Sequence, residues 1–292
     1  MDYIKTKIYF DGSHYIGIPK TAQYWKKRKH KSKQKTNETE SKVRQLLKEQ
    51  TNETKQEKTE RIVKVLNQDI ENIKQSQAIV NKVIEKDKRN RIVRLTRLSR
   101  KVGLQQWTHF CTFTYDSNKL TEIEFREKFL NCIRHLSNRK GWKYIGVFER
   151  SPELQRLHFH GIFVIPEMVG EIIETKDYST KTHQMQIAHQ NTFFLDRFGR
   201  NDFKPIEDNA MAQKAVRYIL KYIRKTGEKV IYSKHLQTYF VTDVMEDDVI
   251  CTIGQENRKI LLFDNFKCWD LVNGKLFGTV SKELIDNLPK AF

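Results

Sequence analysis

The order of the elements expected between residues 107 and 165 limits the fold of this chain more than any other feature. Residues 110–115 form a β-branched and aromatic run that is typical of a central strand. Thr121-Glu122-Ile123-Glu124 then forms a capping-box sequence, and an apolar face of helical spacing follows as far as Gly141. This pattern predicts a strand followed by a helix of about five turns.

Two more strands are expected directly after this helix. They span residues 144–149 and 156–165, and Pro152 helps to place the turn between them. Strands that are joined by so short a connection pair antiparallel. The sequence therefore predicts an α+β fold with a central antiparallel β-sheet flanked by helices.

The rest of the chain carries weaker patterns. Residues 2–10 and 15–18 are predicted to form a small β-hairpin with a primed turn at Asp11-Gly12. Residues 166–205 are predicted to be a long irregular insertion, and a helix is predicted from about residue 208 to Lys225. Further short strands are predicted at residues 229–233, 238–244, 249–253 and 258–263.

Basic residues are concentrated in the first third of the chain. Residues 1–106 carry 27 Lys and Arg against 12 Asp and Glu, whereas residues 107–292 carry 27 against 24. A cationic block of this size attracts polyanions, so nucleic acid is the expected partner. The alternative is a solvated charged surface that binds nothing. The candidate DNA contacts in this block are Lys26, Lys27, Arg28 and Lys29.

Within this basic block the order is expected to vary. Residues 25–58 include few apolar side chains and are predicted not to order themselves well. Two basic amphipathic helices are predicted between Ile62 and Val102, where apolar residues recur at helical spacing.

These patterns divide the chain into segments. We predict an N-terminal β-hairpin in residues 1–25, a basic, partly disordered and helical extension in 26–106, an α+β core in 107–228 and a β-rich extension in 229–292. The cysteines lie far apart without a CxxC pair, which argues against a zinc ribbon or a disulfide framework. Because no signal peptide and no apolar run of membrane-spanning length occurs, a cytoplasmic protein without a membrane partner is expected.

The sequence His158-Phe159-His160 is the first candidate for chemistry. Residues i and i+2 of a strand face the same side, so His158 and His160 are expected side by side, with Phe159 on the other face. Glu149 ends the preceding strand, and antiparallel pairing can bring its carboxylate beside the histidines. Two imidazoles and a carboxylate suit a catalytic divalent metal. The alternatives are structural or surface histidines and a Glu149 that only forms an ion pair at the hairpin end.

The second candidate lies in the helix predicted to end near Lys225. At roughly 100° per residue, the aliphatic side chains cluster on one side, while Tyr218 and Tyr222 lie opposite them among lysines. Two phenols one turn apart in such surroundings indicate groups presented to something anionic. The alternative is a helix buried on both sides, in which the phenols only complete hydrogen bonds. The basic residues beside the phenols are Lys214, Arg217, Lys221 and Lys225, and Lys214, Arg217 and Lys225 are candidate DNA contacts.

Taken in order, these motifs resemble those of the HUH endonucleases, which include the rolling-circle replication initiators (Rep proteins) of small single-stranded-DNA phages and plasmids. Thr112-Phe113-Thr114-Tyr115 is similar to the first motif of the family, and His158-Phe159-His160 is similar to its histidine signature. Tyr218-x-x-Lys221-Tyr222 looks like its tyrosine helix. The resemblance covers residues 107–228 and implies the HUH, or ferredoxin-like, Rep nuclease fold.

The resemblance also implies a mechanism. A divalent metal, Mg²⁺ or Mn²⁺, is expected at His158, His160 and Glu149, where it polarises the scissile phosphate of single-stranded DNA. A tyrosine attacks that phosphate, which leaves a 5′-phosphotyrosine and a free 3′-OH, and the strand is later rejoined. The expected catalytic residues are Tyr218 as nucleophile, Lys221 as the cation that favours its phenolate, and Tyr222 as a second nucleophile.

The expected partners follow from the same resemblance. Single-stranded or hairpin origin DNA is the expected substrate, and a host helicase and polymerase are expected partners because no GxxxxGK[ST] sequence for an ATP-driven helicase is present. A relaxase or a single-strand transposase would use the same residues. A non-catalytic basic DNA-binding regulator is the alternative from a different class. A histidine-triad hydrolase is excluded, because Ile162 stands where its further histidine is required.

Overall fold

The structure is a computed structural model, and it divides the chain into two compact units. Lys20–Leu98 form a helical unit, and Met1–Pro19 together with Ser99–Phe292 form an α+β unit. No helix in the described ranges is long and apolar enough to cross a membrane. The structure describes residues 2–20, 38–49, 53–151, 155–179, 183–208, 211–212, 214–219, 229–234, 236–254 and 259–288.

The helical unit contains α1 (Glu38–Lys48), α2 (Lys55–Ile70) and most of α3 (Ile73–Gly103). α1 corrects the prediction that residues 25–58 lack order. The reason is a short apolar face, with Val43, Leu46 and Leu47 at helical spacing, that packs against buried residues of α2 and α3. The predicted pair of basic helices corresponds to α2 and α3, and α3 is longer than a typical globular helix.

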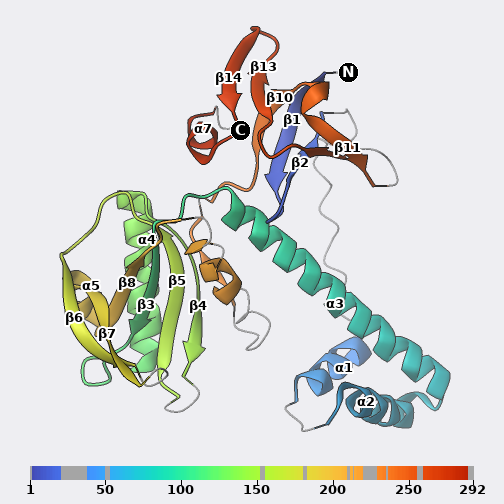
Figure 1. Cartoon of the computed structure of the whole chain (residues 1–292). Helices are drawn as coiled ribbons and strands as arrows, with labels where there is room; N and C mark the ends of the chain where they lie inside the picture. Colours follow the sequence, from blue (N-terminus) through green and yellow to red (C-terminus); the bar gives the residue numbers. More distant parts are fainter. Residues whose placement is uncertain are drawn as a thin grey trace. The chain divides into compact units, whose positions relative to one another are not determined.

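A seven-stranded sheet in the α+β unit combines strands from distant parts of the sequence (Figure 1). Its order is β11-β12-β2-β1-β10-β13-β14, so the predicted hairpin lies between strands that follow residue 240. The backbone N–H of Lys5 also donates to the Asp243 Oδ1, 2.6 Å away. The strands are β1 (Tyr3–Phe10), β2 (Tyr15–Ile18), β10 (Phe240–Val244), β11 (Val249–Ile253), β12 (Lys259–Leu262), β13 (Lys267–Asp270) and β14 (Lys275–Thr279). A 3-10 turn (Glu246–Asp248) and helix α7 (Lys282–Asn287) accompany them.

The turn of the N-terminal hairpin differs from the prediction. The connection spans residues 11–14 and is not a two-residue primed turn. The Asp11 carboxylate accepts hydrogen bonds from the backbone N–H groups of Ser13 and His14, both at 2.9 Å. This Asx-type bonding stabilises a longer loop, in which Gly12 takes the positive φ.

The second sheet is the predicted central antiparallel sheet, and it confirms the α+β class. Its five strands run in the order β8-β3-β5-β4-β9, and every pairing is antiparallel. Helix α4 (Glu122–Lys140) covers one face (Figure 1). The strands are β3 (His109–Thr114), β4 (Lys143–Arg150), β5 (Leu157–Val164), β8 (Asn201–Pro205) and β9 (Ile231–Tyr232).

The prediction of an irregular insertion at residues 166–205 was wrong. This region forms the two-stranded ribbon β6 (Ile172–Ser179) and β7 (Gln184–Asn191), helix α5 (Thr192–Phe198) and strand β8. Side-chain amides help to order it, because the buried Asn201 accepts from the Asn191 N–H at 2.6 Å and donates to the Asn191 carbonyl at 3.1 Å. These bonds join residues on two different elements, which a periodicity analysis does not detect.

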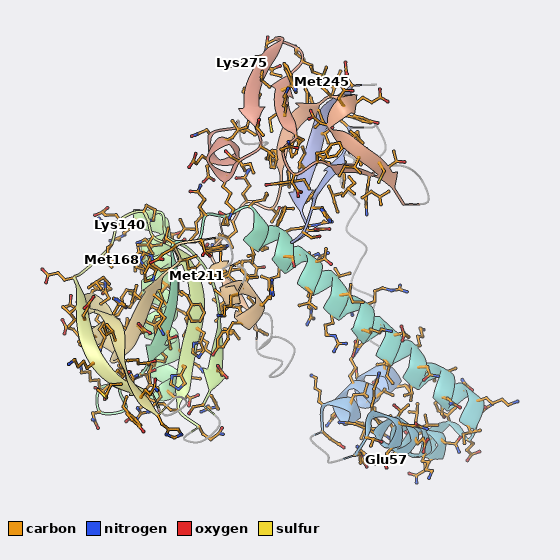
Figure 2. All side chains as sticks on the ribbon, viewed as in Figure 1. Glu57, Lys140, Met168, Met211, Met245 and Lys275 are labelled. Atoms are coloured by element: carbon orange, nitrogen blue, oxygen red, sulfur yellow. The ribbon has the colours of Figure 1, made fainter. Side chains whose placement is uncertain are left out.

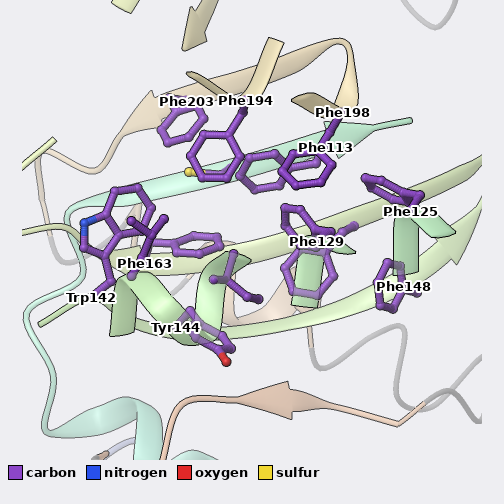
Figure 3. Close-up of a cluster of buried hydrophobic side chains, with 14 of the residues drawn as sticks. Phe113, Phe125, Phe129, Trp142, Tyr144, Phe148, Phe163, Phe194, Phe198 and Phe203 are labelled. Atoms are coloured by element: carbon purple, nitrogen blue, oxygen red, sulfur yellow. The ribbon is translucent and has the colours of Figure 1, made fainter. Parts of the chain in front are cut away.

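An aromatic core fills the space between α4, α5 and the five-stranded sheet (Figure 3). The fully buried Phe129 of α4 stands at its centre, with ring centroids 4.7 Å from Phe113, 4.9 Å from Phe159 and 5.6 Å from Phe198. Because Phe113 and Phe159 alternate with the polar residues of β3 and β5, this packing fixes which side chains reach the opposite face.

The N-terminus of α4 confirms the predicted capping box and leads to a pH prediction. The Glu124 carboxylate accepts from the Thr121 backbone N–H and hydroxyl, both at 2.9 Å, and from Lys128 at 3.1 Å. These bonds lower the pKa of Glu124 from 4.5 to about 2. Because the folded-state pKa is depressed, the carboxylate stabilises the fold above pH 4.5, and this contribution is lost as the pH falls towards 2.

We therefore expect Glu124→Gln to lower the melting temperature at pH 7, and we expect its difference from the wild type to shrink between pH 4.5 and 2. Thermal unfolding followed by circular dichroism across this range measures that difference. A difference that stays constant from pH 7 to pH 2 would contradict the role of the ionised carboxylate.

Candidate active site

Strand β5 places two imidazoles on the sheet face opposite α4. Phe159 points into the aromatic core, whereas His158 and His160 are half-buried on the other face. The two imidazole rings are 5.9 Å apart between centroids, with 27° between their planes. The alternation of β5 therefore aligns the histidines side by side.

Two threonines of β3 hold these rings. The Thr114 hydroxyl is hydrogen-bonded to Nδ1 of His158 at 2.7 Å, and the Thr112 hydroxyl to Nδ1 of His160 at 3.1 Å. A partner on one ring nitrogen fixes the orientation of the ring and directs the other nitrogen, Nε2, elsewhere. Sequence reasoning gave the threonines no role, although Thr112 and Thr114 repeat the two-residue spacing of the histidines on the neighbouring strand.

Glu149 joins the histidines from β4. The backbone register places it opposite His158, but its carboxylate lies diagonally, 3.1 Å from Nε2 of His160. The side chains of His160 and Glu149 are only 12% and 13% exposed. The alternative pairing of Glu149 at the hairpin end is not observed, because Arg150 forms its ion pair with Glu122 of α4.

The electrostatic surroundings keep His158 neutral. Burial lowers its pKa from 6.5 to about 4, the neighbouring His160 lowers it further, and Glu149 opposes the shift. Arg156 and Arg200 contribute in the same direction as burial. At pH 7 the His158 ring is therefore uncharged, which is the form that ligates metals.

The donor set fits a divalent cation chemically. Two imidazoles with fixed Nδ1 atoms and one carboxylate provide mixed nitrogen and oxygen ligands. As the side chains stand, Glu149 contacts His160 while His158 has its own position, and across the described ranges no group of three or more His, Cys, Asp or Glu residues is arranged to hold a metal ion. The residues are therefore gathered on one face without forming a closed three-ligand site.

A tyrosine contacts the same histidines. Residues 214–219 are helical, with Ala215 and Ile219 buried, so Tyr218 lies off the packing stripe and is 36% exposed. Its ring stands edge-on to His160, with 5.5 Å between centroids and 80° between the planes. The ring of Phe110 on β3 also lies 5.6 Å from the Tyr218 ring. The phenol thus stands next to the paired imidazoles.

Other predicted residues are placed only in part. Lys214 and Arg217 are exposed on the helical segment that carries Tyr218. Phe110 was missed, since nothing in an aromatic strand residue indicates that it will contact a functional side chain. The predicted residues Lys221, Tyr222, Lys225, Lys26, Lys27, Arg28 and Lys29 lie outside the described residues.

A glycine pair keeps β4 and β5 close behind the histidines. Gly146 faces Gly161, and a Cβ at Gly146 would lie 2.3 Å from the Phe159 ring and 2.6 Å from the His160 carbonyl oxygen. Because the carbonyl belongs to the backbone, it cannot yield cheaply. We expect Gly146→Ala to destabilise the protein by about 1–3 kcal/mol. Urea unfolding measures this, and a change within about 0.5 kcal/mol would contradict the close packing.

Comparison with known proteins supports one family. Residues 108–227 match the model of the replication-associated protein ORF2 family. The matched segment contains the paired histidines, Glu149, the two threonines and Tyr218. Comparisons with curated proteins and with solved structures found no match.

Proposed function

Since residues 108–227 form a domain of the replication-associated protein ORF2 family, we propose that this protein initiates rolling-circle replication by nicking single-stranded origin DNA. The observation that carries the proposal is the contact of Tyr218 with His160. A partly exposed phenol beside two imidazoles and a carboxylate supports a tyrosine-dependent strand transfer on the HUH nuclease fold. A regulator that only binds DNA has no need of this arrangement.

In the proposed reaction Tyr218 is the nucleophile. Its phenol loses a proton, and the phenolate oxygen attacks the phosphorus of the scissile phosphodiester. A P–O bond to tyrosine forms, the P–O3′ bond breaks, and the released 3′-oxygen takes up a proton. The products are a 5′-phosphotyrosine and a free 3′-OH. Because one phosphodiester replaces another, the reverse attack by a 3′-OH rejoins the strand without ATP.

The residues opposite α4 have distinct parts in this proposal. His158, His160 and Glu149 would hold the cation, with Thr114 and Thr112 keeping both rings in orientation. Mg²⁺ or Mn²⁺, when bound, supplies Lewis-acid polarisation of the scissile phosphate. The low pKa of His158 keeps this ring available as a ligand at pH 7.

Further roles are proposed for residues around the nucleophile. Lys214 and Arg217, both exposed on the Tyr218 helix, would contact the DNA backbone, as would Lys225. Lys221 would favour the phenolate, and Tyr222 would act as a second nucleophile. A host helicase and polymerase would open and extend the nicked strand.

The test is a search for the covalent intermediate. Purified protein is incubated with Mn²⁺ and single-stranded DNA that carries the replication origin of its replicon, and adducts are separated on a denaturing gel. Mass spectrometry then locates the nucleotide. We expect a DNA-linked peptide that contains Tyr218. Peptides linked at neither Tyr218 nor Tyr222 would refute the assigned nucleophile, and the absence of any adduct would favour a non-catalytic DNA-binding regulator.

A further inference from the structure

The middle of α3 carries a regular basic stripe. A cation recurs at every third position, and Arg89 adds one more. No Asp or Glu occurs between Asp87 and Asp116. Acidic partners on this stretch of the helix are therefore absent from the sequence itself. The members of the stripe, all exposed, are Lys88, Arg91, Arg94 and Arg97.

The stripe winds around the helix rather than along one side. Each step of three residues turns back by roughly 60°, so the four cations cover roughly half the circumference. Arg89 lies on the half that the stripe leaves uncovered. The apolar residues between them are also exposed, Ile92 by 54% and Val93 by 40%. Side chains accordingly project to both sides of the α3 ribbon (Figure 2).

A basic hollow lies beside the start of the stripe, within the helical unit. Its volume is about 380 Å³, and its lining includes the cations Lys55 and Lys58 of α2 together with Lys88 and Arg91 of α3. Asp87 is the one acidic residue in the lining, and its carboxylate is 3.3 Å from the guanidinium of Arg44. Lys88 also lies 3.6 Å from Glu85. The hollow and the stripe thus form a continuous cationic surface.

We propose that residues 88–97 of α3 bind duplex DNA in its major groove, with the cations of the hollow on the adjoining backbone. The major groove admits one α-helix, and inside it phosphates of both strands flank the helix. Cations on opposite sides of one helix match that arrangement, whereas a single strand offers phosphates to one side only. Ile92 and Val93 then face the base edges, where apolar groups contact thymine methyls.

This inference rests on the proposed function only in taking DNA as the partner. It assigns the duplex next to the nicking site to the helical unit, and it leaves the single strand to the Tyr218 site. The competing interpretation is a charged helix that is merely solvated.

Salt dependence of binding separates these interpretations. Fluorescence anisotropy is measured with the full-length chain, a labelled short duplex of random sequence and, separately, its single strand, in EDTA so that no cleavage occurs. The test variant replaces Arg89, Arg91, Arg94 and Arg97 by Gln. A second variant replaces the same residues by Lys. The control replaces the exposed Lys48, Lys64, Lys74 and Lys82 by Gln, which removes equal charge from the same unit.

We expect the Gln variant to bind the duplex at least about tenfold more weakly, and its salt slope to fall by roughly 0.9 for each phosphate that the protein no longer neutralises. The Lys variant should keep most of the slope, the lysine control should keep the wild-type slope, and single-strand binding should change less than duplex binding. Equal weakening in the Gln variant and the lysine control would overturn the proposal. So would equal weakening for duplex and single strand. Because binding is measured without catalysis, neither result depends on the adduct test of the nuclease.

Discussion

Tyr218→Phe is expected to reduce formation of the covalent DNA adduct by roughly 10⁴-fold or more, because it removes the attacking oxygen. The substitution leaves the ring, and with it the edge-on contact to His160, in place. The phenylalanine variant should therefore fold normally and still bind single-stranded DNA. Adduct yield is measured on denaturing gels under single-turnover conditions, with DNA binding measured in parallel.

Tyr232→Phe is the matched control for this variant. Tyr232 is an exposed tyrosine in β9, at the edge of the same sheet, and it does not contact the histidines through any described ring interaction. Its substitution should leave the adduct yield within twofold of the wild type. An undiminished adduct in Tyr218→Phe, abolished only when Tyr222 is also replaced, would transfer the role of nucleophile to Tyr222.

Phe129→Ala is expected to lower the free energy of unfolding by about 3–5 kcal/mol. The side chain is fully buried and contacts aromatic rings from β3, β5 and α5, so its removal leaves a cavity that these rigid rings cannot fill. Domains are stable by only about 5–15 kcal/mol, so the variant should be close to unfolding at 37 °C.

Ile123→Ala on the same helix is the matched control. Ile123 is 71% exposed, and its truncation should change the free energy of unfolding by no more than about 0.5 kcal/mol. Urea titration of both variants gives the comparison. A decrease below about 1 kcal/mol in Phe129→Ala would mean that the aromatic core does not hold α4 against the sheet.

Sequence patterns predicted the elements whose signals are local. α4 begins after Thr121 and ends before Gly141, as the capping box and the glycine indicate, because cap residues bond to backbone within a few positions. The same holds for β5, in which alternation alone places His158 and His160 on one face. Local chemistry determined these features, so one sequence was enough to predict them.

Features that depend on distant partners were not predictable in this way. β8 has the sequence Asn-Asp-Phe-Lys-Pro, which is poor in strand-forming residues, and it exists because β3 offers it an open edge where Pro205 is tolerated. The ring of Phe110 meets Tyr218 only after the strand and the helix have packed. The diagonal contact of Glu149 with His160 likewise depends on side-chain geometry that the register leaves open.

The bond between Lys5 and Asp243 joins residues that are 238 positions apart, and this separation bears on how the protein is made. A ribosome adds about 5–20 residues per second, so β1 emerges roughly 10–50 s before β10 can pair with it. During that interval β1 and β2 have neither of their flanking strands, and an isolated hairpin is marginally stable in water. The nascent chain must therefore complete its five-stranded sheet first and recruit its own beginning last, which makes chaperone binding to the first twenty residues a natural requirement of biosynthesis.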